Sequence, residues 1–450
     1  MTALRTRLSK DSRAALGRRA SRVRLFPAVT VALLAGLGVA FIAYGFLRWI
    51  TPVDTSKTAA EIDVTRVALT VVAGVGGVVA LVIAYRRQRD LEQGRFVERF
   101  GAAAAQLGAT DVAVRIAGVY AMAGVADESD GLRRQQCIDV LCGYLRLPYS
   151  PELGGNHQTR HVQKRTVTGD TGENEDHFEY RQNDREVRAT IVRVITDHLR
   201  PEAEYSWSTS NFDFRTAHLE NVDFSRAVFS GAAHFEEATF TGGAGFNVVT
   251  FADDARFDEA TFTGIASFAR ATFTDNAGFN VVTFADDARF DEATFTSIAA
   301  FGGATFTSDA EFGEATFTSN AEFAGATFSD AGFNRATFTD IADFGRAVFT
   351  GDAGFIETTF AGKAGFTETT FAGGCEFDRA TFADDVSFAK VAFMNWATFR
   401  TTDFGSGRVA FTTPRRWGPP PPQFDWADDG HRKPSNIAPT EWPPAVAAVS

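Results

Sequence analysis

Residues Phe257–Phe279 read FDEATFTGIASFARATFTDNAGF, and closely similar stretches fill much of the chain. Phenylalanine returns at steps of five and six residues in alternation, at Phe257, Phe262, Phe268, Phe273 and Phe279. The unit is therefore an eleven-residue repeat, close to A-x-F-x-x-A-x-F-x-x-x. Self-similarity at a fixed period is the sequence signature of a repeat architecture, so this pattern decides the fold.

A helical coiled coil with an eleven-residue period is the first alternative. On an α-helix, steps of five and six residues would turn by roughly 140° and 240°, so the Phe side chains would form two ridges instead of one seam. Thr and Phe also favour strands, and Gly is a poor helix former. The pattern therefore predicts a solenoid of short strands. Phe and the Ala two residues before it point inward, the flanking Thr points outward, and Gly, Asp, Asn and Ser turn the corners.

Residues 213–229 carry the closest match to a known motif. Phe214, Leu219, Phe224 and Phe229 follow one another at steps of five, and Ala217 and Ala227 precede two of them. This stretch resembles the pentapeptide-repeat proteins, whose motif A-(D/N)-L-x-x buries the central Leu or Phe and the preceding Ala. The resemblance implies a right-handed quadrilateral β-helix with one repeat per side. From Phe229 onward the chain departs from the motif by adding a residue at every second step. The family's members have different activities, so the resemblance implies no particular biochemistry.

The repeats predict the dimensions of the rod. About 36 sides between Phe214 and Phe404 give about nine coils, on the order of 40 Å at one strand spacing per coil. Wide corners are expected on one diagonal of each coil and tight corners on the other. Residues Ala244–Thr263 are repeated letter for letter at Ala277–Thr296. That offset is one and a half coils, so the copies are expected on opposite flanks, which favours expansion of a scaffold over one localised binding face.

The first 85 residues predict a membrane anchor. Residues 1–25 form a basic segment, with eight Lys and Arg against Asp11. Phe26–Ile50 and Val67–Tyr85 are apolar runs, and Arg86, Arg87 and Arg89 follow the second run. Together these features predict two transmembrane helices with a short loop within residues 26–85. The basic flanks place both termini, and therefore the β-helix, in the cytoplasm of a cell-membrane protein with two spans.

The remaining segments follow from composition and periodicity. Residues 86–148 are predicted as a helical domain with Asp111 as an N-cap, and residues 185–200 as an amphipathic helix. Residues 149–184 are polar and unpatterned, which predicts a flexible linker. Residues 211–411 form the β-helix, and residues 412–450 an end cap, covered by Trp417, Phe424 and Trp426, with a Pro-rich disordered tail. Three stretches of the helical region are similar to that of membrane-anchored bacterial pentapeptide-repeat proteins: Arg95–Phe100, Val114–Tyr120 and Cys142–Arg146.

Catalytic chemistry has little support in the sequence. It contains no nucleotide-binding loop, zinc-protease motif, nucleophile elbow or CxxC pair. His157 and His161 have metal-like spacing only on a helix, and they lie in the predicted linker. Cys137 and Cys142 are expected to be buried small hydrophobic residues. The pairs Asp253–Asp254 and Asp286–Asp287 resemble calcium ligands but lie at predicted corners without a matching loop. We therefore expect no catalytic, cofactor-binding or metal-binding residues, and no cofactor.

The charge balance bears on partners. Between Asn211 and Phe411 there are 29 Asp and Glu against 12 Lys and Arg, so we expect no direct binding of nucleic acid by the rod. Some soluble pentapeptide-repeat proteins are acidic rods that imitate DNA and bind topoisomerases, and this stays open as the alternative function. The preferred interpretation is a non-enzymatic, membrane-tethered protein-interaction scaffold. Its protein partner is not identified by the sequence, and it could form a homo-oligomer.

Overall fold

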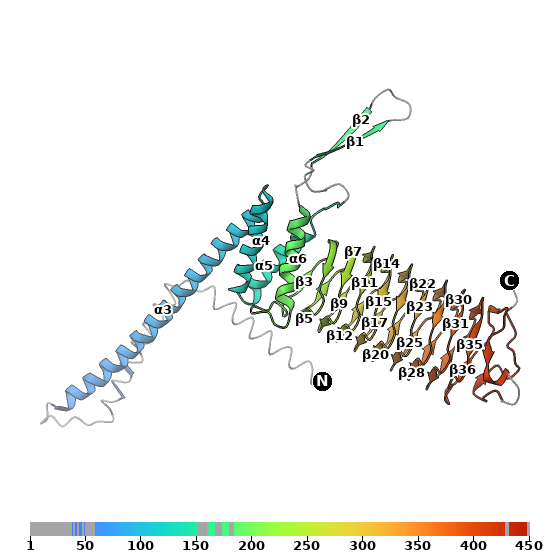
Figure 1. The fold of residues 1–450 in the computed structure, drawn as a ribbon. Helices are drawn as coiled ribbons and strands as arrows, with labels where there is room; N and C mark the ends of the chain where they lie inside the picture. Colours follow the sequence, from blue (N-terminus) through green and yellow to red (C-terminus); the bar gives the residue numbers. More distant parts are fainter. Residues whose placement is uncertain are drawn as a thin grey trace. The chain divides into compact units, whose positions relative to one another are not determined.

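The computed structural model describes residues 59–151, 160–166, 173–179, 184–427 and 432–447, together with residues 38, 41, 42, 45, 46 and 49. The chain divides into two compact units, Met1–Glu98 and Arg99–Ser450. The second unit contains three helices, a hairpin and a long stack of short strands (Figure 1). We describe each unit by itself.

Helix α3 (Ala59–Leu107) runs for 49 residues without a break. Its large apolar side chains are open to solvent: Val78, Leu81 and Tyr85 are 64%, 71% and 65% exposed. Among the helical residues that the structure describes, no helix combines the length and the apolar character required to cross a bilayer. The first predicted span, residues 26–50, lies almost wholly outside the described residues. The two-span anchor therefore stays a prediction.

Three helices form the predicted helical region of the second unit: α4 (Val112–Asp127), α5 (Gly131–Leu145) and α6 (Asp184–Leu199). Asp111 is the N-cap of α4, as predicted, and its Oδ1 accepts hydrogen bonds from the backbone N of Ala113 at 2.8 Å and of Val114 at 3.4 Å. Residues 128–130 join α4 to α5, and Gly131, the first residue of α5, has φ +48°, which Gly adopts without steric cost.

The predicted flexible linker of residues 149–184 is wrong in part. It contains two strands, β1 (Arg160–Thr166) and β2 (Glu173–Glu179), which pair antiparallel over seven residues. The sequence hides this hairpin because its strands are strongly charged and contain few of the β-branched or aromatic residues that mark strands. One ion pair joins the strands, with Lys164 Nζ 2.8 Å from Glu175 Oε1.

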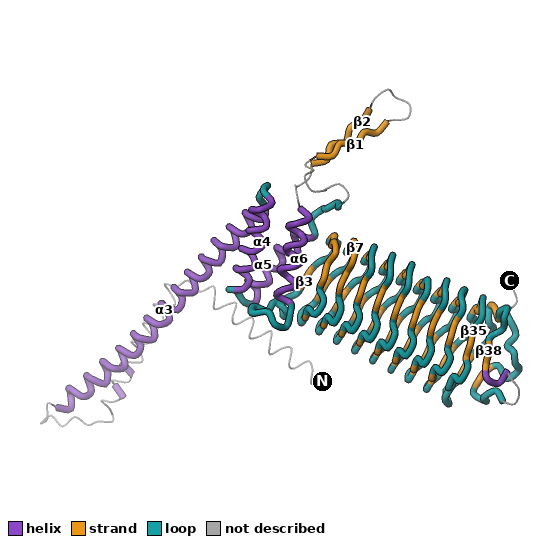
Figure 2. The backbone as a smooth tube through the Cα atoms, viewed as in Figure 1, coloured by secondary structure: helices purple, strands orange, loops and turns teal. Residues whose placement is uncertain are grey.

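The predicted β-helix is a right-handed-type solenoid of about ten turns (Figure 2). We number its four faces in chain order around one coil. Face 1 contains β3 (Phe212–Asp213), β6 (Ala233–His234), β9 (Ala255–Arg256), β13 (Ala277–Gly278), β17 (Ala299–Ala300), β21 (Ala321–Glu322), β25 (Ala342–Asp343), β29 (Ala364–Gly365), β33 (Val386–Ser387), β36 (Val409–Ala410) and β39 (Ile437–Ala438). Face 4 contains β5 (Val228–Phe229), β8 (Thr250–Phe251), β12 (Thr272–Phe273), β16 (Thr294–Phe295), β20 (Thr316–Phe317), β24 (Thr337–Phe338), β28 (Thr359–Phe360) and β32 (Thr381–Phe382).

The other two faces lie between these. Face 2 contains β10 (Thr261–Phe262), β14 (Thr283–Phe284), β18 (Thr305–Phe306), β22 (Thr327–Phe328), β26 (Val348–Phe349), β30 (Thr370–Phe371), β34 (Ala392–Phe393) and β37 (Arg416–Trp417). Face 3 contains β11 (Ala266–Ser267), β15 (Ala288–Arg289), β19 (Ala310–Glu311), β23 (Ala331–Gly332), β27 (Ala353–Gly354), β31 (Cys375–Glu376), β35 (Ala397–Phe399) and β38 (Gln423–Phe424). In the first two coils, β4 (His218–Asp223) and β7 (Thr239–Gly245) run through the corner that joins faces 2 and 3.

Parallel pairing of each coil with the next builds the core. Thr272 pairs with Thr294 and Phe273 with Phe295, so identical positions stack. The Phe273 and Phe295 rings are parallel within 1° at a centroid distance of 4.7 Å, and Phe317 continues the column at 4.8 Å. The inward positions of Phe, and of the Ala two residues before it, are almost completely buried, as predicted. Stacked Phe columns on all four faces therefore fill the interior.

The corners alternate as predicted. After Phe257 the chain turns within two residues: Glu259 has φ +59°, and Ala260 N donates to Phe257 O at 3.0 Å. Arg270 makes the same turn at the diagonally opposite corner, with φ +56°. Wide corners of three residues separate these tight corners. The corner at Ser329–Asp330 is only two residues long, and the pairing offset falls from 22 to 21 there before the stack continues.

Both ends of the rod are covered. Helices α5 and α6 pack on β3 and β4 at the N-terminal end. At the other end Trp417, Phe424 and Trp426 lie against the last Phe residues, which confirms the predicted cap. The predicted disorder of the tail is wrong for residues 432–447, because Ile437 pairs with Val409 and the Trp442 ring packs on Phe424 at 5.2 Å. With β37 and β38, this segment adds a turn to the nine that were predicted.

Candidate functional site

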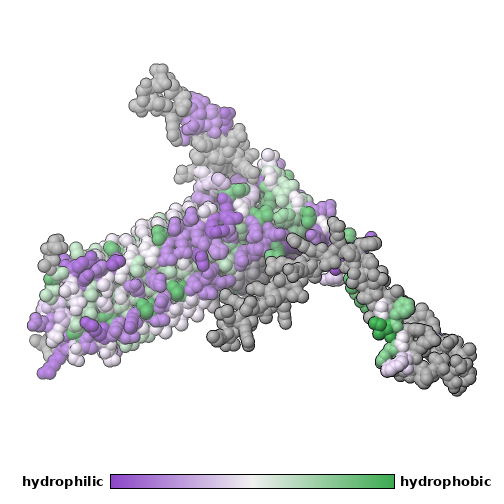
Figure 3. All heavy atoms as spheres, turned by 180° about the vertical axis from the view of Figure 1, so that it is seen from behind, coloured by the Kyte–Doolittle hydropathy of each residue, from purple (hydrophilic) through white to green (hydrophobic). Residues whose placement is uncertain are grey.

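The rod separates charge by face. From β5 to β32 on face 4, and from β10 to β34 on face 2, the outward strand positions carry Thr, Val or Ala and no charged residue. Asp, Glu and Arg occur at the outward strand positions of faces 1 and 3 and at the corners. In Figure 3, hydrophilic patches therefore alternate with pale and hydrophobic ones on the visible side of the rod. Faces 1 and 3 are opposite each other, so the rod has two charged flanks.

Many corner carboxylates and amides are used within the rod. Asp258 Oδ1 accepts a hydrogen bond from Asn280 N at 3.0 Å, and Asn280 Oδ1 accepts one from Gly302 N at 3.0 Å. On another corner Asp330 and Asp352 each bond to the backbone N–H one coil further on. These side chains satisfy backbone donors that the wide and tight corners would otherwise leave unpaired. A large part of the acidic residues is therefore structural.

Ion pairs also run from coil to coil. Arg335 lies 2.8 Å from Glu314, and Arg379 lies 3.1 Å from Glu357. Glu368 contacts both Arg346 and Lys390. All of these side chains are substantially exposed, so each pair contributes little to stability. Their effect is to neutralise part of the charge at the tight corners.

One part of face 3 keeps an excess of negative charge. Burial, together with the neighbouring carboxylates of Asp291, Asp309 and Asp287, raises the pKa of Glu311, and burial raises the pKa of Asp291. Arg289 is the nearby cation and pairs with Asp287 at 3.3 Å. This acidic region is the feature of the rod that fits the DNA-like alternative.

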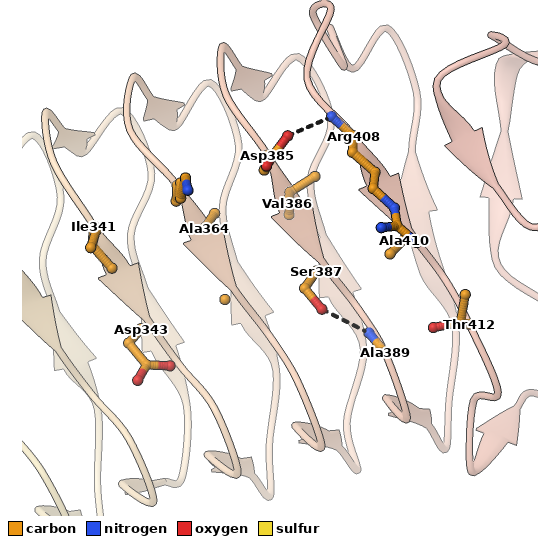
Figure 4. A pocket seen from close by; sticks show the side chains of 12 residues that line it. Ile341, Asp343, Ala364, Asp385, Val386, Ser387, Ala389, Arg408, Ala410 and Thr412 are labelled. Carbon is orange, nitrogen blue, oxygen red and sulfur yellow. Dashed lines mark hydrogen bonds between the residues drawn. The ribbon is translucent and has the colours of Figure 1, made fainter.

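A shallow groove of about 470 Å³ lies on face 1 near the C-terminal end (Figure 4). It exists because Gly365 and Ala364 place no large side chain between Asp343 and Ser387. A Cβ at Gly365 would lie 3.2 Å from Asp343 Oδ1. Two of the polar groups at its rim are already bonded: Asp385 accepts from Arg408 N, and Ser387 Oγ accepts from Ala389 N. The groove is open to solvent and does not bring reactive groups together.

The residues that the sequence singled out for metal binding do not form a convincing centre. The carboxylates of Asp253, Asp254 and Asp275 come within 4.8 Å of one another at a wide corner. Asp254 is also paired with Arg256 at 2.9 Å and bonded by Asn276 at 3.3 Å. The second copy differs, since Asp287 accepts from Ser308 Oγ at 2.9 Å and no third carboxylate joins it among the clusters of described residues.

The histidines and cysteines are also accounted for. His161 lies on strand β1, so it cannot share a helical face with His157, which is outside the described residues. Cys137 and Cys142 are buried on α5, as predicted. Burial raises the pKa of the Cys137 thiol to about 11 and that of Cys142 to about 12. Both thiols are therefore protonated at neutral pH and unreactive.

A buried polar network, which sequence reasoning missed, joins the helices. The Arg115 guanidinium on α4 donates to Tyr144 Oη at 2.9 Å and to Asp184 Oδ1 at 2.6 Å. Tyr144 also donates to Asp184 at 2.5 Å, and burial with this bond raises the Tyr144 pKa. The only sequence signal is an Arg within an otherwise apolar helix. Because Asp184 begins α6, this network fixes α6 against α4 and α5.

A second network attaches the helices to the rod. Arg188 on α6 donates to the carbonyl oxygens of Tyr144, Leu145 and, at 3.0 Å, His218. Its guanidinium lies over the Tyr149 ring, whose hydroxyl donates to Glu220 at 2.8 Å. All of these groups are used in packing one element on another. We therefore assign both networks a structural role.

The architecture defines a class: a β-solenoid of four short strands per coil with a small helical region at one end. Within it, residues 224–272, 257–302, 290–337 and 333–381 match the family model described as Pentapeptide repeats (9 copies). The predicted resemblance is confirmed for this part of the chain. Comparisons with curated proteins and with solved structures gave no match. Proteins with pentapeptide-repeat solenoids are generally structural or interaction proteins, so the comparison supports a scaffold and names no partner.

Proposed function

We propose that the protein is a non-enzymatic scaffold, tethered to a membrane through residues 26–85, which presents the rod to a protein partner in the cytoplasm. The scaffold proposal rests on one observation: many polar side chains of the rod are used in hydrogen bonds within the rod. Corner Asp and Asn residues bond to the backbone of the next coil, and the groove on face 1 is shallow and open. Such a surface offers a long rigid face for a protein and no enclosed site for a small molecule.

Support for the tether comes from α3 and from the sequence around it. Leu81, Val82 and Ile83 are all exposed, and consecutive residues point to different sides of a helix, about 100° apart. A helix that is apolar all round is stable when an apolar environment covers it. Arg86, Arg87 and Arg89 follow directly, as expected at the cytoplasmic end of a span.

Reporter fusions test the topology. A reporter in the loop of residues 51–66 and one at the C-terminus should lie on opposite sides of the membrane. A C-terminal reporter outside the cytoplasm would overturn both the topology and the cytoplasmic scaffold. The chain remaining soluble after cell lysis would overturn the tether itself.

Site-specific crosslinking tests the scaffold. A photoreactive residue at Ser387, in the groove of face 1, should capture a protein in native membranes. The same residue at Thr272, on uncharged face 4, is the matched control and should capture much less. Equal capture at both positions, or none at either, would contradict a partner bound along the charged flanks.

The acidic region around Glu311 favours one second candidate, an acidic rod that binds a topoisomerase or another nucleic-acid-binding protein. The repeat gives a way to separate the two proposals. Deleting Phe246–Ser267 removes one full coil, and deleting Phe257–Ser267 removes half a coil, which exchanges faces 1 and 3 downstream. If the partner binds one acidic face, the half-coil deletion should abolish its capture and the full-coil deletion should not. We expect both deletions to fold, by circular dichroism, and to keep partner capture.

A further inference from the structure

The hairpin of β1 and β2 is an insertion between α5 and α6, and the packing of these helices does not require it. Helices α5 and α6 both contact the first coil of the rod, and Tyr149, just after α5, is bonded to Glu220 of β4. Helices that lie together in this way are usually joined by two to eight residues. The connection from Leu145 to Asp184 is several times longer and contains the whole hairpin.

The two strands have opposite charge. Strand β1 (RHVQKRT) contains three Arg and Lys residues and no acidic residue, whereas β2 (ENEDHFE) contains four acidic residues and no Lys or Arg. Their register places opposite charges across from each other, with Arg160 facing Glu179 and Lys164 facing Glu175. The Arg160 guanidinium also contacts the His177 ring.

Neither strand is completed by another part of the chain that the structure describes. The hairpin is a two-stranded sheet by itself, and Arg160, Val162, Lys164, Glu175 and His177 are all exposed. A two-stranded hairpin is marginally stable alone. Each outer edge also presents a row of backbone N–H and C=O groups that can pair with another strand.

We propose that this hairpin is a self-association site, in which β1 of one copy pairs with β2 of a second copy to form a four-stranded antiparallel sheet. Charge selects this arrangement. Pairing β1 with β1, or β2 with β2, would place like charges opposite each other, which is unfavourable. Pairing β1 with β2 places basic positions opposite acidic ones, as the register within the hairpin does.

The dimer is the smallest assembly that this pairing forms, and it leaves one β2 edge and one β1 edge unpaired at the two ends of the four-stranded sheet. The interface is small and charged, which predicts weak association that falls with salt.

A charge-swapped hairpin provides the test. The variant carries Arg160→Glu, Lys164→Glu, Glu175→Lys and Glu179→Arg, so both cross-strand pairs within the hairpin keep opposite charges. The swapped chain should therefore dimerise with itself as the natural chain does. In mixtures, however, every contact between a natural and a swapped hairpin joins like charges, so mixed dimers should form at least ten-fold less than either homodimer.

The experiment uses full-length chains in detergent micelles, labelled with two dyes, with energy transfer measured at micromolar concentrations and at two salt concentrations. As a matched control, the exposed rod pair is exchanged through Glu314→Arg and Arg335→Glu, and this variant should mix freely with the natural chain. Statistical mixing of the natural and hairpin-swapped chains would show that dimers form elsewhere and overturn the proposal. Absence of any self-association at low salt up to tens of micromolar would overturn it equally.

Discussion

The Phe columns make a strong quantitative prediction at Phe295. This side chain is 1% exposed and lies between Phe273 and Phe317, with ring centroids at 4.7 and 4.8 Å. Phe301 meets it edge-on at 6.0 Å. Phe→Ala in a well-packed core costs about 3–5 kcal/mol, and aromatic pairs add about 0.5–1.5 kcal/mol beyond their buried area. Because a solenoid coil cannot collapse around the gap without disturbing the coils above and below, we expect Phe295→Ala to cost about 4–5 kcal/mol.

The neighbouring residue is the control. Thr294 points outward on the same strand, and its backbone N donates to Ala271 O at 2.8 Å, a bond that Ala would keep. Thr294→Ala should therefore cost well under about 1 kcal/mol. Both substitutions lie on one two-residue strand, so their position along the rod is the same. A difference in unfolding free energy therefore reports whether the side chain points inward or outward.

Tryptophan positions supply the assay. Trp207 lies near the N-terminal end of the rod, while Trp417, Trp426 and Trp442 lie at the C-terminal end. Denaturant unfolding should be followed by circular dichroism and by fluorescence of these residues, because a long repeat array need not unfold in one step. Phe295→Ala should lower the midpoint strongly and could uncouple the two ends. Similar losses for Phe295→Ala and Thr294→Ala would refute the inward register.

Three further predictions concern the corners, the helices and pH. Glu292 has φ +56°, so Glu292→Asn should stabilise the rod by about 0.5–1 kcal/mol, raising the melting temperature, whereas Glu322→Asn on a regular strand should not. Arg115→Ala leaves Asp184 and Tyr144 without their buried partner and should cost about 3 kcal/mol in denaturant unfolding; an unchanged midpoint would show that the network is dispensable. The raised pKa of Glu311 means that the folded rod holds this proton more tightly than the unfolded chain, so stability falls as pH rises through this pKa. Glu311→Gln should therefore stabilise the protein at pH 7 and have little effect at pH 3; a gain that is independent of pH would contradict this cause.

The sequence predicted the rod well because one physical pattern determines it. The repeat places each inward Phe in a two-residue strand or directly after one, and the same position of the next coil again carries Phe, so the period alone predicts the face, the register and the corners. The prediction failed where stability comes from pairwise contacts between distant residues. Neither the bond from Arg115 to Asp184 nor the pairing of Ile437 with Val409 leaves a periodic signal, and the charged hairpin lacks apolar alternation.

The candidate site was less predictable for a related reason. In the sequence, Asp258 and Asn280 cannot be told apart from polar residues that are available to a partner. Only the structure shows that their side-chain oxygens accept hydrogen bonds from backbone N–H groups of the next coil. The groove on face 1 depends on the absence of a side chain at Gly365 next to Asp343 one coil away. A gap of this kind is a property of stacked coils, so a linear reading that takes one repeat at a time does not reveal it.

The alternation of tight and wide corners makes the rod an adjustable spacer. Because an eleven-residue unit contains one corner of each kind, inserting or removing one unit preserves the order of corners and changes the distance between the two ends by half a strand spacing, about 2.4 Å. The same step turns everything beyond it by half a revolution. Two units restore the direction and change the length by about 4.8 Å. The letter-for-letter copy at Ala277–Thr296 has an offset of three such units. A duplication of this size changes the length of the rod and also turns the part beyond it by half a revolution.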